Sequence, residues 1–517
     1  MAVAGDIKVL VDWNNDGDYL DANDDVTGDA LSLSWERGRD YASALLGESI
    51  AGRLSLVLLN STGLYSPSNS SGALYGNLKP GRTIRVAVTS GTFPYTFPFV
   101  FDDAPQWEGQ IERIVPSPSA AAVNTCKIEA FGVLGYLNQF QVQLASQTNR
   151  ATGAAIGDIL DDVGWTASDD RSLDTGQTTI PRFWISGAKT IDALRSVEEA
   201  EAGFVREGKD SKIIFEDRYY RLTTTTSTTS QATFSDASGA TNPYMAIEEV
   251  DPLAAVLNHI EASATTYDTP AVAVLWTLPE SGAASPKLAP GQTKIYEAQY
   301  PNTSSGNNAS EVDTWTTPAS TTDYTANTAA DGTGTDRTAS VSVSVTKKAE
   351  RMTISLQNTH PDDIYITKLQ ARGQAAETNT KVIVRAIDTT SQTVFGDRKY
   401  ESKTPFHPSA ELAQDWCDYH LSVYSDPVQI IGMTFDADSG SNLTQVLNRE
   451  ISERITLVAT GDAGLGISAD FFIESVQHTI VPGNHTDRWE LSPASTGYSK
   501  FWLLGTGVLG TSTVPAY

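Results

Sequence analysis

The sequence is poor in several residue types, and each shortage excludes a class of protein. Its 517 residues include two cysteines, Cys126 and Cys417, too few for a disulfide framework and typical of a chain made in a reducing compartment. Lys and Arg number 36 against 63 Asp and Glu, a formal net charge of −27. Few cations are therefore present to bind nucleic-acid phosphates. No apolar run reaches the ~18 residues of a membrane-spanning helix.

Motifs of known chemistry are also missing, so we predict no catalytic residue. The six histidines form no His-Glu-x-x-His pair, and the sequence contains no Cys-x-x-Cys, Gly-x-Ser-x-Gly or P-loop. His478 falls on the face of an expected strand, and we interpret it as structural. Gly505–Gly510 has dinucleotide-binding spacing, but it lies seven residues from the C-terminus and reads as a flexible tail. The N-terminus lacks the basic and apolar regions of a secretion signal.

What the sequence does contain is short strands and turns. Of its residues 40% are hydrophobic and 19% charged, with 39 Gly and 23 Pro, which is typical of a folded chain rich in turns. The length predicts about three or four domains at roughly 100–200 residues each. In a first domain, 1–148, apolar residues alternate over 7–11, 31–35, 54–58, 84–88 and 126–130. Such alternation predicts an antiparallel barrel or sandwich.

The next segment, 149–235, mixes helices and strands. Apolar residues at helical spacing predict a helix over Ile156–Val163 that ends at Gly164, and a second over Ile191–Ala202 that is stopped by Gly203. Residues 204–216 then read as a β-hairpin. The tract Thr223–Ser230 is almost pure Thr and Ser, and we expect a solvated loop there.

The second half of the chain returns to strands. A β-rich segment, 236–372, contains a polar, Gly-rich insertion at about 270–356, where Val341, Val343 and Val345 alternate with Ser. This pattern predicts a small β-sandwich with one solvated face. The last segment, 373–517, carries a helix over 409–425, strands at 429–435, 454–458 and 470–480, and a C-terminal tail. The predicted class is mainly β with a few helices (α+β).

One loop has the spacing of a calcium site. Oxygen side chains stand at positions 1, 3 and 5 of Asp12–Asp21 and Gly17 at position 6, which is how a tight loop turns its ligands onto Ca²⁺. Position 12 is Asn23, not the usual Glu, and Asp24 is a further candidate. The predicted ligands of a structural, non-catalytic Ca²⁺ are Asp12, Asn14, Asp16, Asp18 and Asp21. The alternative is an acidic Asx-turn loop that binds no metal.

Several motifs together resemble the tail hub (baseplate hub-like) proteins of long-tailed bacteriophages. They cover most of the chain outside about 270–356, and each is a turn or packing signature. They are Val11–Asp18, Leu33–Arg39, Ala51–Leu54, Leu59–Pro67, Leu74–Asn77, Pro80–Arg82, Trp107–Ile111, the 191–216 segment, the Trp416 helix with Tyr424–Pro427, and Asp470–Glu474 through Trp489–Pro493.

The resemblance implies a fold and a set of partners. It implies two tail-tube-like β-barrels, and a homotrimeric ring that joins a sixfold tail tube to a threefold tip. The expected partners are the distal tail or tube protein, the tape measure protein and the tip or spike protein, with DNA only in transit through the lumen. The location is the virion tail tip, after synthesis in the bacterial host cytoplasm. Because the chain is acidic, we further expect Asp and Glu on the lumen wall, where they would repel DNA.

Two other functions stay open on the sequence. The insertion contains Trp276, Tyr296, Tyr300, Trp315 and Tyr324, and aromatic side chains exposed on a sandwich can stack on sugars, as in a host-binding adhesin. The same residues could instead pack in the core of the sandwich. A tail-associated cell-wall hydrolase is the third reading, and no nucleophile or metal motif supports it.

Overall fold

The computed structural model describes residues 7–39, 49–89, 103–120, 122–250, 253–279, 283–300, 309–378, 381–438, 440–461, 464–494, 501–502 and 514–515. Strands predominate in these residues, and eight α-helices lie between them. The predicted class, mainly β with a few helices, is confirmed. No helix in the described ranges is long and apolar enough to cross a membrane. Gly505–Gly510 lies outside the described residues.

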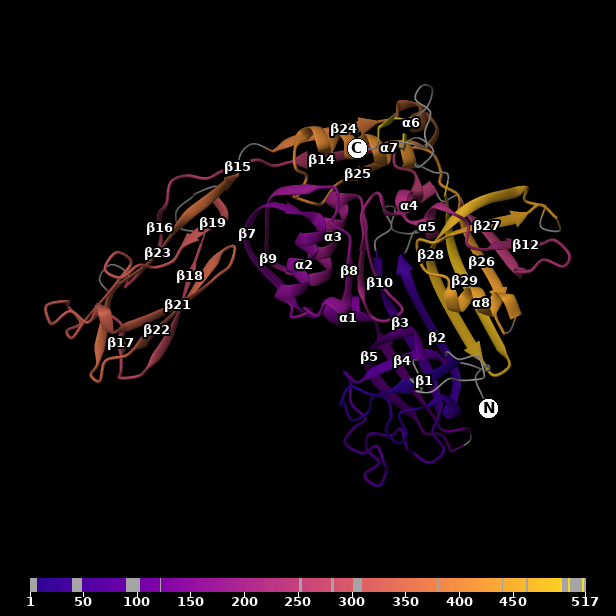
Figure 1. The fold of residues 1–517 in the computed structure, drawn as a ribbon, viewed down its shortest axis with the longest axis horizontal. Helices are drawn as coiled ribbons and strands as arrows, with labels where there is room; N and C mark the ends of the chain where they lie inside the picture. The colour runs from indigo at the N-terminus through magenta and orange to yellow at the C-terminus, as the bar shows by residue number, and fades with distance from the viewer. Residues whose placement is uncertain are drawn as a thin grey trace.

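The N-terminal module is a six-stranded sheet, at the bottom of Figure 1. Its order is β1-β4-β5-β6-β3-β2, and all of its pairings are antiparallel. All five predicted strands are present, and their alternating apolar residues form one core around Trp13, Trp35 and Trp107. The strands are β1 (Ile7–Val11), β2 (Ala30–Arg39), β3 (Ser49–Leu59), β4 (Thr83–Thr89), β5 (Asp103–Ser117) and β6 (Thr125–Phe131), followed by helix α1 (Val133–Leu137).

An α/β unit follows, in which two helices pack on an antiparallel pair of long strands, β7 and β9. Both predicted helices are confirmed, and their apolar faces, including Ile156, Leu160 and Leu194, form a second core. The second helix ends at Glu201, and its C-cap Ala202, one residue before the predicted stop at Gly203, takes the left-handed conformation (φ 53°). The elements are β7 (Gln141–Ala151), α2 (Thr152–Asp162), β8 (Arg171–Leu173), β9 (Thr179–Lys189), α3 (Thr190–Glu201) and the predicted hairpin β10 (Phe204–Glu207) with β11 (Ile213–Glu216).

The tract Thr223–Ser230 is not the predicted loop. It takes part in two short helices, α4 (Tyr220–Thr223) and α5 (Thr225–Thr228). The hydroxyls of Thr223 and Thr228 donate to carbonyls four residues earlier, and the hydroxyl of buried Ser227 donates to the Ser452 carbonyl at 2.8 Å. The loop prediction from polar composition was wrong because Ser and Thr hydroxyls can form hydrogen bonds with the helical backbone as well as with water.

The C-terminal module is also six-stranded, with the order β12-β27-β28-β29-β26-β13. The three predicted strands in this part are confirmed as β26, β27 and β28. The first half of β28 pairs with β27, and its second half pairs with β2 of the N-terminal module. The elements are β12 (Thr233–Ser235), β13 (Ala246–Val250), β26 (Ile430–Asp436), α8 (Gly440–Asn448), β27 (Arg454–Ala459), β28 (Ile467–Val481) and β29 (Asn484–Pro493).

The β2–β28 pairing joins the two modules into one twelve-stranded sheet. The two tube-like barrels implied by the resemblance correspond in position to these modules. Within the described ranges their strand pairings leave both modules open rather than closed on themselves. Residues Leu33–Gly38 face Ser475–Ile480 across this joint, so the modules share backbone hydrogen bonds as well as side-chain contacts.

A helix–sheet layer connects the C-terminal module to the insertion. The predicted 409–425 helix is α7, and the Ser409 hydroxyl caps it by accepting from the Leu412 N–H at 3.2 Å. Its buried face, with Trp416 and Cys417, packs on strands β14 and β24. The elements are β14 (His259–Ala264), β24 (Val382–Ile387), α6 (Thr389–Phe395), β25 (Lys399–Glu401) and α7 (Ala410–Tyr424).

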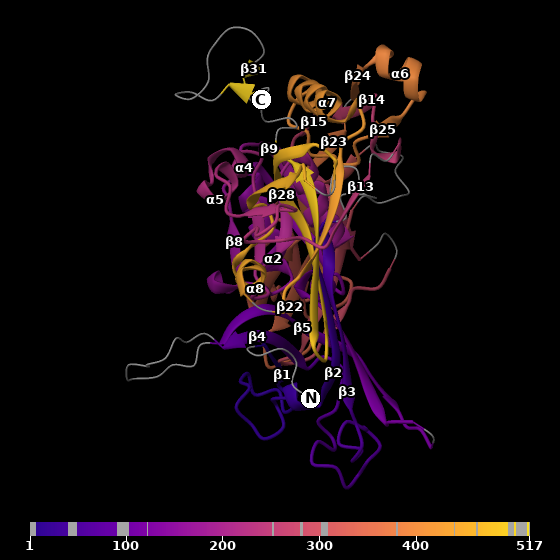
Figure 2. The same ribbon diagram turned by 90° about the vertical axis from the view of Figure 1, so that its right-hand side faces the viewer.

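The insertion is a β-sandwich that extends away from the other units (Figure 1), and Figure 2 shows the molecule turned by 90°. One sheet centres on the 15-residue strand β23 and the other has the order β18-β22-β21, with an apolar core between them. The strands are β15 (Tyr267–Asp268), β16 (Ala273–Leu278), β17 (Lys287–Leu288), β18 (Thr293–Gln299), β19 (Ala309–Thr316), β20 (Tyr324–Asn327), β21 (Val341–Lys347), β22 (Arg351–Asn358) and β23 (Ile364–Thr378). The serines of β21 are exposed, as predicted.

Candidate functional site at the module junction

The predicted calcium loop follows β1 and folds around Asp12. Asp12 is buried, and its carboxylate accepts from the backbone N–H groups of Asn15, Asp16 (3.2 Å) and Gly17 (3.0 Å). Asn15 and Gly17 have positive φ, which gives the loop its tight turn. Asp12 therefore acts as the internal cap of an Asx-type loop.

The other predicted ligands lie on the exposed side of this loop. The Asn14 amide donates to the carboxylates of Asp16 (2.9 Å) and Asp21, while Asp18 accepts from the Leu20 N–H at 2.9 Å. Asp24 is buried, which raises its pKa, and it accepts from the Asp21 N–H. The loop thus brings Asn14, Asp16 and Asp21 together, whereas Asp12 and Asp18 are engaged by backbone. Calcium binding by Asp12, Asn14, Asp16, Asp18 and Asp21 stays a prediction.

A different cluster satisfies the geometry of a metal site. Among the described residues, His478, His485 and Asp487 are the one group of three His, Cys, Asp or Glu side chains whose ligand atoms all lie within 4.8 Å of one another. His478 lies on a strand face, as predicted, and its ring stacks on Trp35 with centroids 4.1 Å apart. Burial lowers the pKa of His478 and favours the neutral imidazole. The spacing matches neither His-Glu-x-x-His nor Cys-x-x-Cys, because the cluster forms across the β28–β29 hairpin.

The five aromatic residues of the insertion pack inward. Tyr300 and Trp315 are buried, and Trp276, Tyr296 and Tyr324 are half-buried against the same core. The Trp315 indole N–H donates to the Lys348 carbonyl at 2.8 Å. These side chains therefore pack in or against the sandwich core. This is the alternative that the sequence left open beside stacking on sugars.

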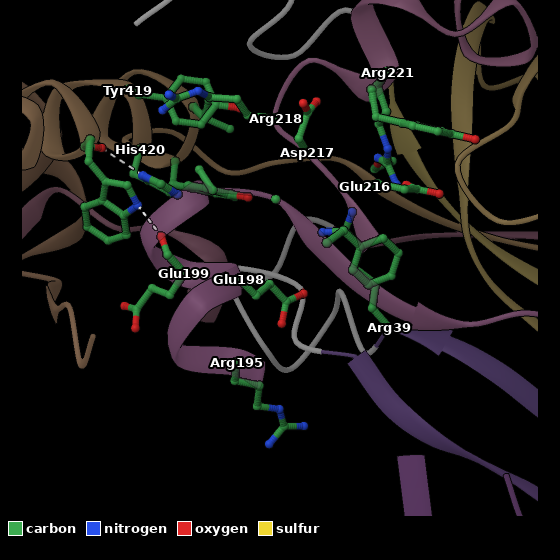
Figure 3. Close-up of a pocket in the computed structure, with 18 of the residues that line it drawn as sticks. Arg39, Arg195, Glu198, Glu199, Glu216, Asp217, Arg218, Arg221, Tyr419 and His420 are labelled. Carbon is green, nitrogen blue, oxygen red and sulfur yellow. Dashed lines mark hydrogen bonds between the residues drawn. The ribbon is translucent and has the colours of Figure 1, made fainter. Parts of the chain in front are cut away.

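A polar cavity lies where the modules and the α/β unit meet. A cavity of about 440 Å³ opens between α3, α4, α7, β2 and β28. Figure 3 shows Arg39, Arg221 and Glu216 on one side of it, and Glu198, Glu199 and His420 on the other. The walls carry both signs of charge together with aromatic rings.

On the α3 side, the polar groups hold the helix layer in place. The Glu198 carboxylate accepts from the Val205 N–H at 3.0 Å, and Glu199 accepts from the Tyr400 hydroxyl at 3.0 Å. The Trp416 indole N–H donates to the Glu199 carbonyl at 2.9 Å. His420 contacts the Trp416 carbonyl, and burial lowers its pKa to about 4, so its ring is neutral at pH 7. These contacts tie α7 to α3.

On the other side, a chain of ion pairs that we call the junction network links three units. Glu474 on β28 accepts both guanidinium nitrogens of Arg221 on α4, at 2.7 and 3.0 Å, and pairs with Arg39 on β2 at 2.7 Å. Burial alone would raise the pKa of Glu474, but Arg221 and Arg39 lower it to about 2. The carboxylate is fully buried, so its ionised form depends on these partners.

The network continues through the α/β unit and returns to β2. Arg206 on β10 pairs with Glu216 on β11 at 2.7 Å and with Glu450 at 3.4 Å. Glu450 also pairs with Arg37 of β2, and these cations, with Lys209, overcome burial and lower its pKa to about 2. The Ser452 hydroxyl bridges Glu216 and Arg221. The junction network comprises Arg37, Arg39, Arg206, Glu216, Arg221, Glu450, Ser452 and Glu474.

A separate buried acid joins the α/β unit to the N-terminal module. Glu207 accepts from the Gly52 N–H at 3.0 Å and the Leu134 N–H at 2.6 Å. Burial raises the pKa of Glu207 to about 7, although both N–H groups favour the ionised form. A Cβ atom at Gly52 or Gly132 would overlap the Glu207 carboxylate, so both positions need glycine for this close approach.

The sequence did not reveal these residues as a site. Arg37 and Arg39 lie in the Leu33–Arg39 motif and Glu474 in the Asp470–Glu474 motif, but their partners are up to 413 residues away along the chain. No local spacing carries that information. The arrangement fixes the orientation of the modules, and its acids are neutralised by cations or backbone N–H groups.

Comparison with solved structures finds tail proteins and related components at low sequence identity. No protein-family model matches the chain, and no curated protein matches it. A tail protein from Neisseria meningitidis is 9% identical, covers 96% of this chain and 98% of its own, with a TM-score of 0.49. A prophage tail protein from Shewanella oneidensis is 9% identical, covers 95% and 99%, with a TM-score of 0.48. An Escherichia coli component of the type VI secretion system is 7% identical, covers 90% and 73%, with a TM-score of 0.37. The solved structures similar to this chain thus include tail proteins, the class that its sequence resembles.

Proposed function

We propose that the chain is a structural hub and adaptor subunit of a phage tail tip. In this proposal three copies form a ring, and the ring joins the sixfold tail tube to the threefold tip. The observation that supports it is the pair of six-stranded modules joined where β2, at the edge of the N-terminal module, pairs with the second half of β28. Three such chains offer six modules around an axis, which is what an adaptor between sixfold and threefold symmetry needs.

An adaptor also has to hold its modules at a fixed angle. A ring closes only if the rotation from one module to the next is constant, and a flexible joint would permit open assemblies. The continuous sheet and the junction network supply this rigidity, because bending the joint would break buried ion pairs as well as backbone hydrogen bonds.

The lumen and the partners follow from the ring. The tape measure protein, and then DNA, would pass through the ring, and three copies would carry three times the −27 charge of one chain. Acidic side chains on the lumen wall would keep DNA from sticking. The proposed neighbours are the distal tail or tube protein and the tip or spike protein, and the proposed location is the virion tail tip. We propose no chemical reaction for the chain.

Light scattering coupled to size exclusion tests the ring. A homotrimer would have three times the 55.5 kDa mass of one chain. Incubation with the tube protein of the same phage should produce a larger complex. A chain that stays monomeric at high concentration, alone and with the tube protein, would contradict the proposal.

A further inference from the structure

The His478–His485–Asp487 cluster lies at the joint between the two modules, inside the protein. His478 on β28 stands directly opposite Asp487 on β29, and His485 is two residues before Asp487. The three side chains are 4%, 0% and 0% exposed. His478 also faces Trp35 of β2, so the cluster touches the strand that joins the N-terminal module.

The polar atoms of this cluster are close together, yet they are not aligned for hydrogen bonds. The Nδ1 atom of His478 is 2.8 Å from one Asp487 oxygen, and the Nε2 atom of His485 is 3.0 Å from the other. Even so, these two nitrogens and both carboxylate oxygens are buried without a hydrogen-bond partner. Burying a polar atom without a hydrogen-bond partner is unfavourable because the atom loses its hydration, and here only the attraction between the imidazoles and the carboxylate offsets that loss.

His259 provides the contrast within the same chain. It also lies beside two carboxylates, Asp397 and Glu261, each at 3.1 Å. There both ring nitrogens make hydrogen bonds, and the site is partly open to solvent. Contacts between imidazole and carboxylate are therefore hydrogen-bonded around His259, but they are not aligned for hydrogen bonds where Asp487 lies between His478 and His485.

A bound metal would satisfy the unpartnered atoms. Imidazole nitrogen and carboxylate oxygen are ligands of Zn²⁺, with bonds of about 2.0–2.2 Å. In a tetrahedral site such bonds place neighbouring ligand atoms ~3.3 Å apart. The two contacts to Asp487, at 2.8 and 3.0 Å, are shorter than that separation by about half an ångström or less, and all three ligand atoms lie within 4.8 Å of one another. Ca²⁺ and Mg²⁺ fit less well, because they prefer six or more oxygen ligands.

We propose that His478, His485 and Asp487 bind a structural Zn²⁺ ion that fastens the β28–β29 hairpin beneath the β2–β28 joint. The ion would supply positive charge to a buried carboxylate and fix both rings at the boundary between the two module cores. The neighbouring Arg37 guanidinium is paired with Glu450, so it does not add an uncompensated charge. The proposal does not depend on the hub function, since it concerns one chain alone.

Metal analysis of the full chain, with any affinity tag removed, tests the proposal. We expect about one zinc per chain after purification without chelator, and a fall in melting temperature after prolonged chelation. Adding Zn²⁺ alone should restore the melting temperature, whereas Mg²⁺ or Ca²⁺ should not. Co²⁺ added in place of Zn²⁺ should give the visible absorption of a tetrahedral cobalt site. A metal-free chain whose melting temperature and spectrum do not respond to Zn²⁺ or Co²⁺ would overturn the proposal.

Matched variants locate the site. Asp487→Asn keeps the size of the side chain but removes the charged ligand, and His259→Ala removes the histidine that is satisfied by hydrogen bonds. Loss of a residue that only hydrogen-bonds to a metal ligand typically lowers metal affinity about 10–100-fold. Asp487 is proposed as a direct ligand, so we expect Asp487→Asn to lower zinc affinity by at least about 10-fold. His259→Ala should leave zinc affinity unchanged. Equal zinc binding by Asp487→Asn and the unmodified chain would contradict the assignment. If Asp487→Asn does not fold, the measurements on the unmodified chain decide.

Discussion

The module junction and the inserted sandwich are attached to the α/β unit in different ways. At the junction, Glu474 is fully buried between Arg39 and Arg221, and β2 pairs with β28 through backbone hydrogen bonds. At the insertion, Asp313 pairs with Arg182, and Lys348 pairs with Asp162 at 2.5 Å, all of them partly exposed. One further contact is the edge-on packing of Tyr267 against Trp184.

This difference indicates which part of the molecule sets its geometry. Buried ions without partners are strongly unfavourable, so the junction tolerates one orientation of the modules. Partly exposed ion pairs contribute little, so the sandwich is held mainly by its own core and by its two chain connections. We therefore expect changes at the junction to disturb the whole chain and its assembly, and changes in the insertion to stay local.

The largest effect is expected from Glu474→Ala. The substitution leaves Arg39 and Arg221 buried without their anion, and it should lower the free energy of unfolding by about 3–5 kcal/mol. Urea denaturation measures it, with Asp313→Ala as the control, which should cost ~1 kcal/mol or less. Equal costs for the two substitutions would remove the distinction between the two attachments.

Leu356→Ala should destabilise the insertion alone. Leu356 is fully buried in the sandwich core, and its truncation should destabilise that unit by about 2–5 kcal/mol. Hydrogen exchange should accelerate in β16–β23 and stay unchanged in β2 and β28. Faster exchange at the joint would show that the two regions are coupled.

Titration of Glu207 should make the free energy of unfolding depend on pH. Its pKa is raised to about 7 in the fold from a usual value near 4.5, so its stabilising contribution is complete below pH 4.5 and is lost as pH rises through 7. The loss amounts to about 3 kcal/mol. Denaturation at pH 5 and pH 8 should show it as the difference between the unmodified chain and Glu207→Gln. Buried His407 and His420, whose pKa is lowered to about 4, act in the opposite direction in both proteins and cancel. A pH profile unchanged by Glu207→Gln would contradict the expectation.

The smallest effect on assembly is expected from removing the insertion. Ala264 and Val382 face each other in the β14–β24 pair, so residues 265–381 can be replaced by an Asn-Gly turn without breaking this pair. The shortened chain should fold and form the same oligomer in light scattering. Loss of the oligomer on this deletion would place an essential contact in the sandwich.

Regular elements were predictable from the sequence because their signals are local. The alternation in β1 to β4 and the helical spacing in α2, α3 and α7 each require only a few neighbouring residues. Strand β5 was harder to see, because Pro105 and Gly109 interrupt its pattern. The Thr223–Ser230 tract was wrongly predicted as a loop. Its short helices are stabilised by hydrogen bonds from side-chain hydroxyls to backbone carbonyls, one of which joins Ser227 to Ser452, 225 residues away.

The junction network and the histidine cluster could not be found in the same way. Arg37 and Glu450 are brought together by the β2–β28 pairing, which no spacing in the sequence encodes. The cluster of His478, His485 and Asp487 arises from the register of the β28–β29 hairpin, and only that register places Asp487 opposite His478. Both features need tertiary structure before their charges and ligands can be recognised.

A cryo-electron microscopy reconstruction of the tail tip is the most direct test of the central claim. We predict a ring of three copies viewed along the tail axis, with the N-terminal and C-terminal modules alternating at six similar positions around an open lumen. A different number of copies, or modules that lie outside the ring wall, would contradict the hub proposal.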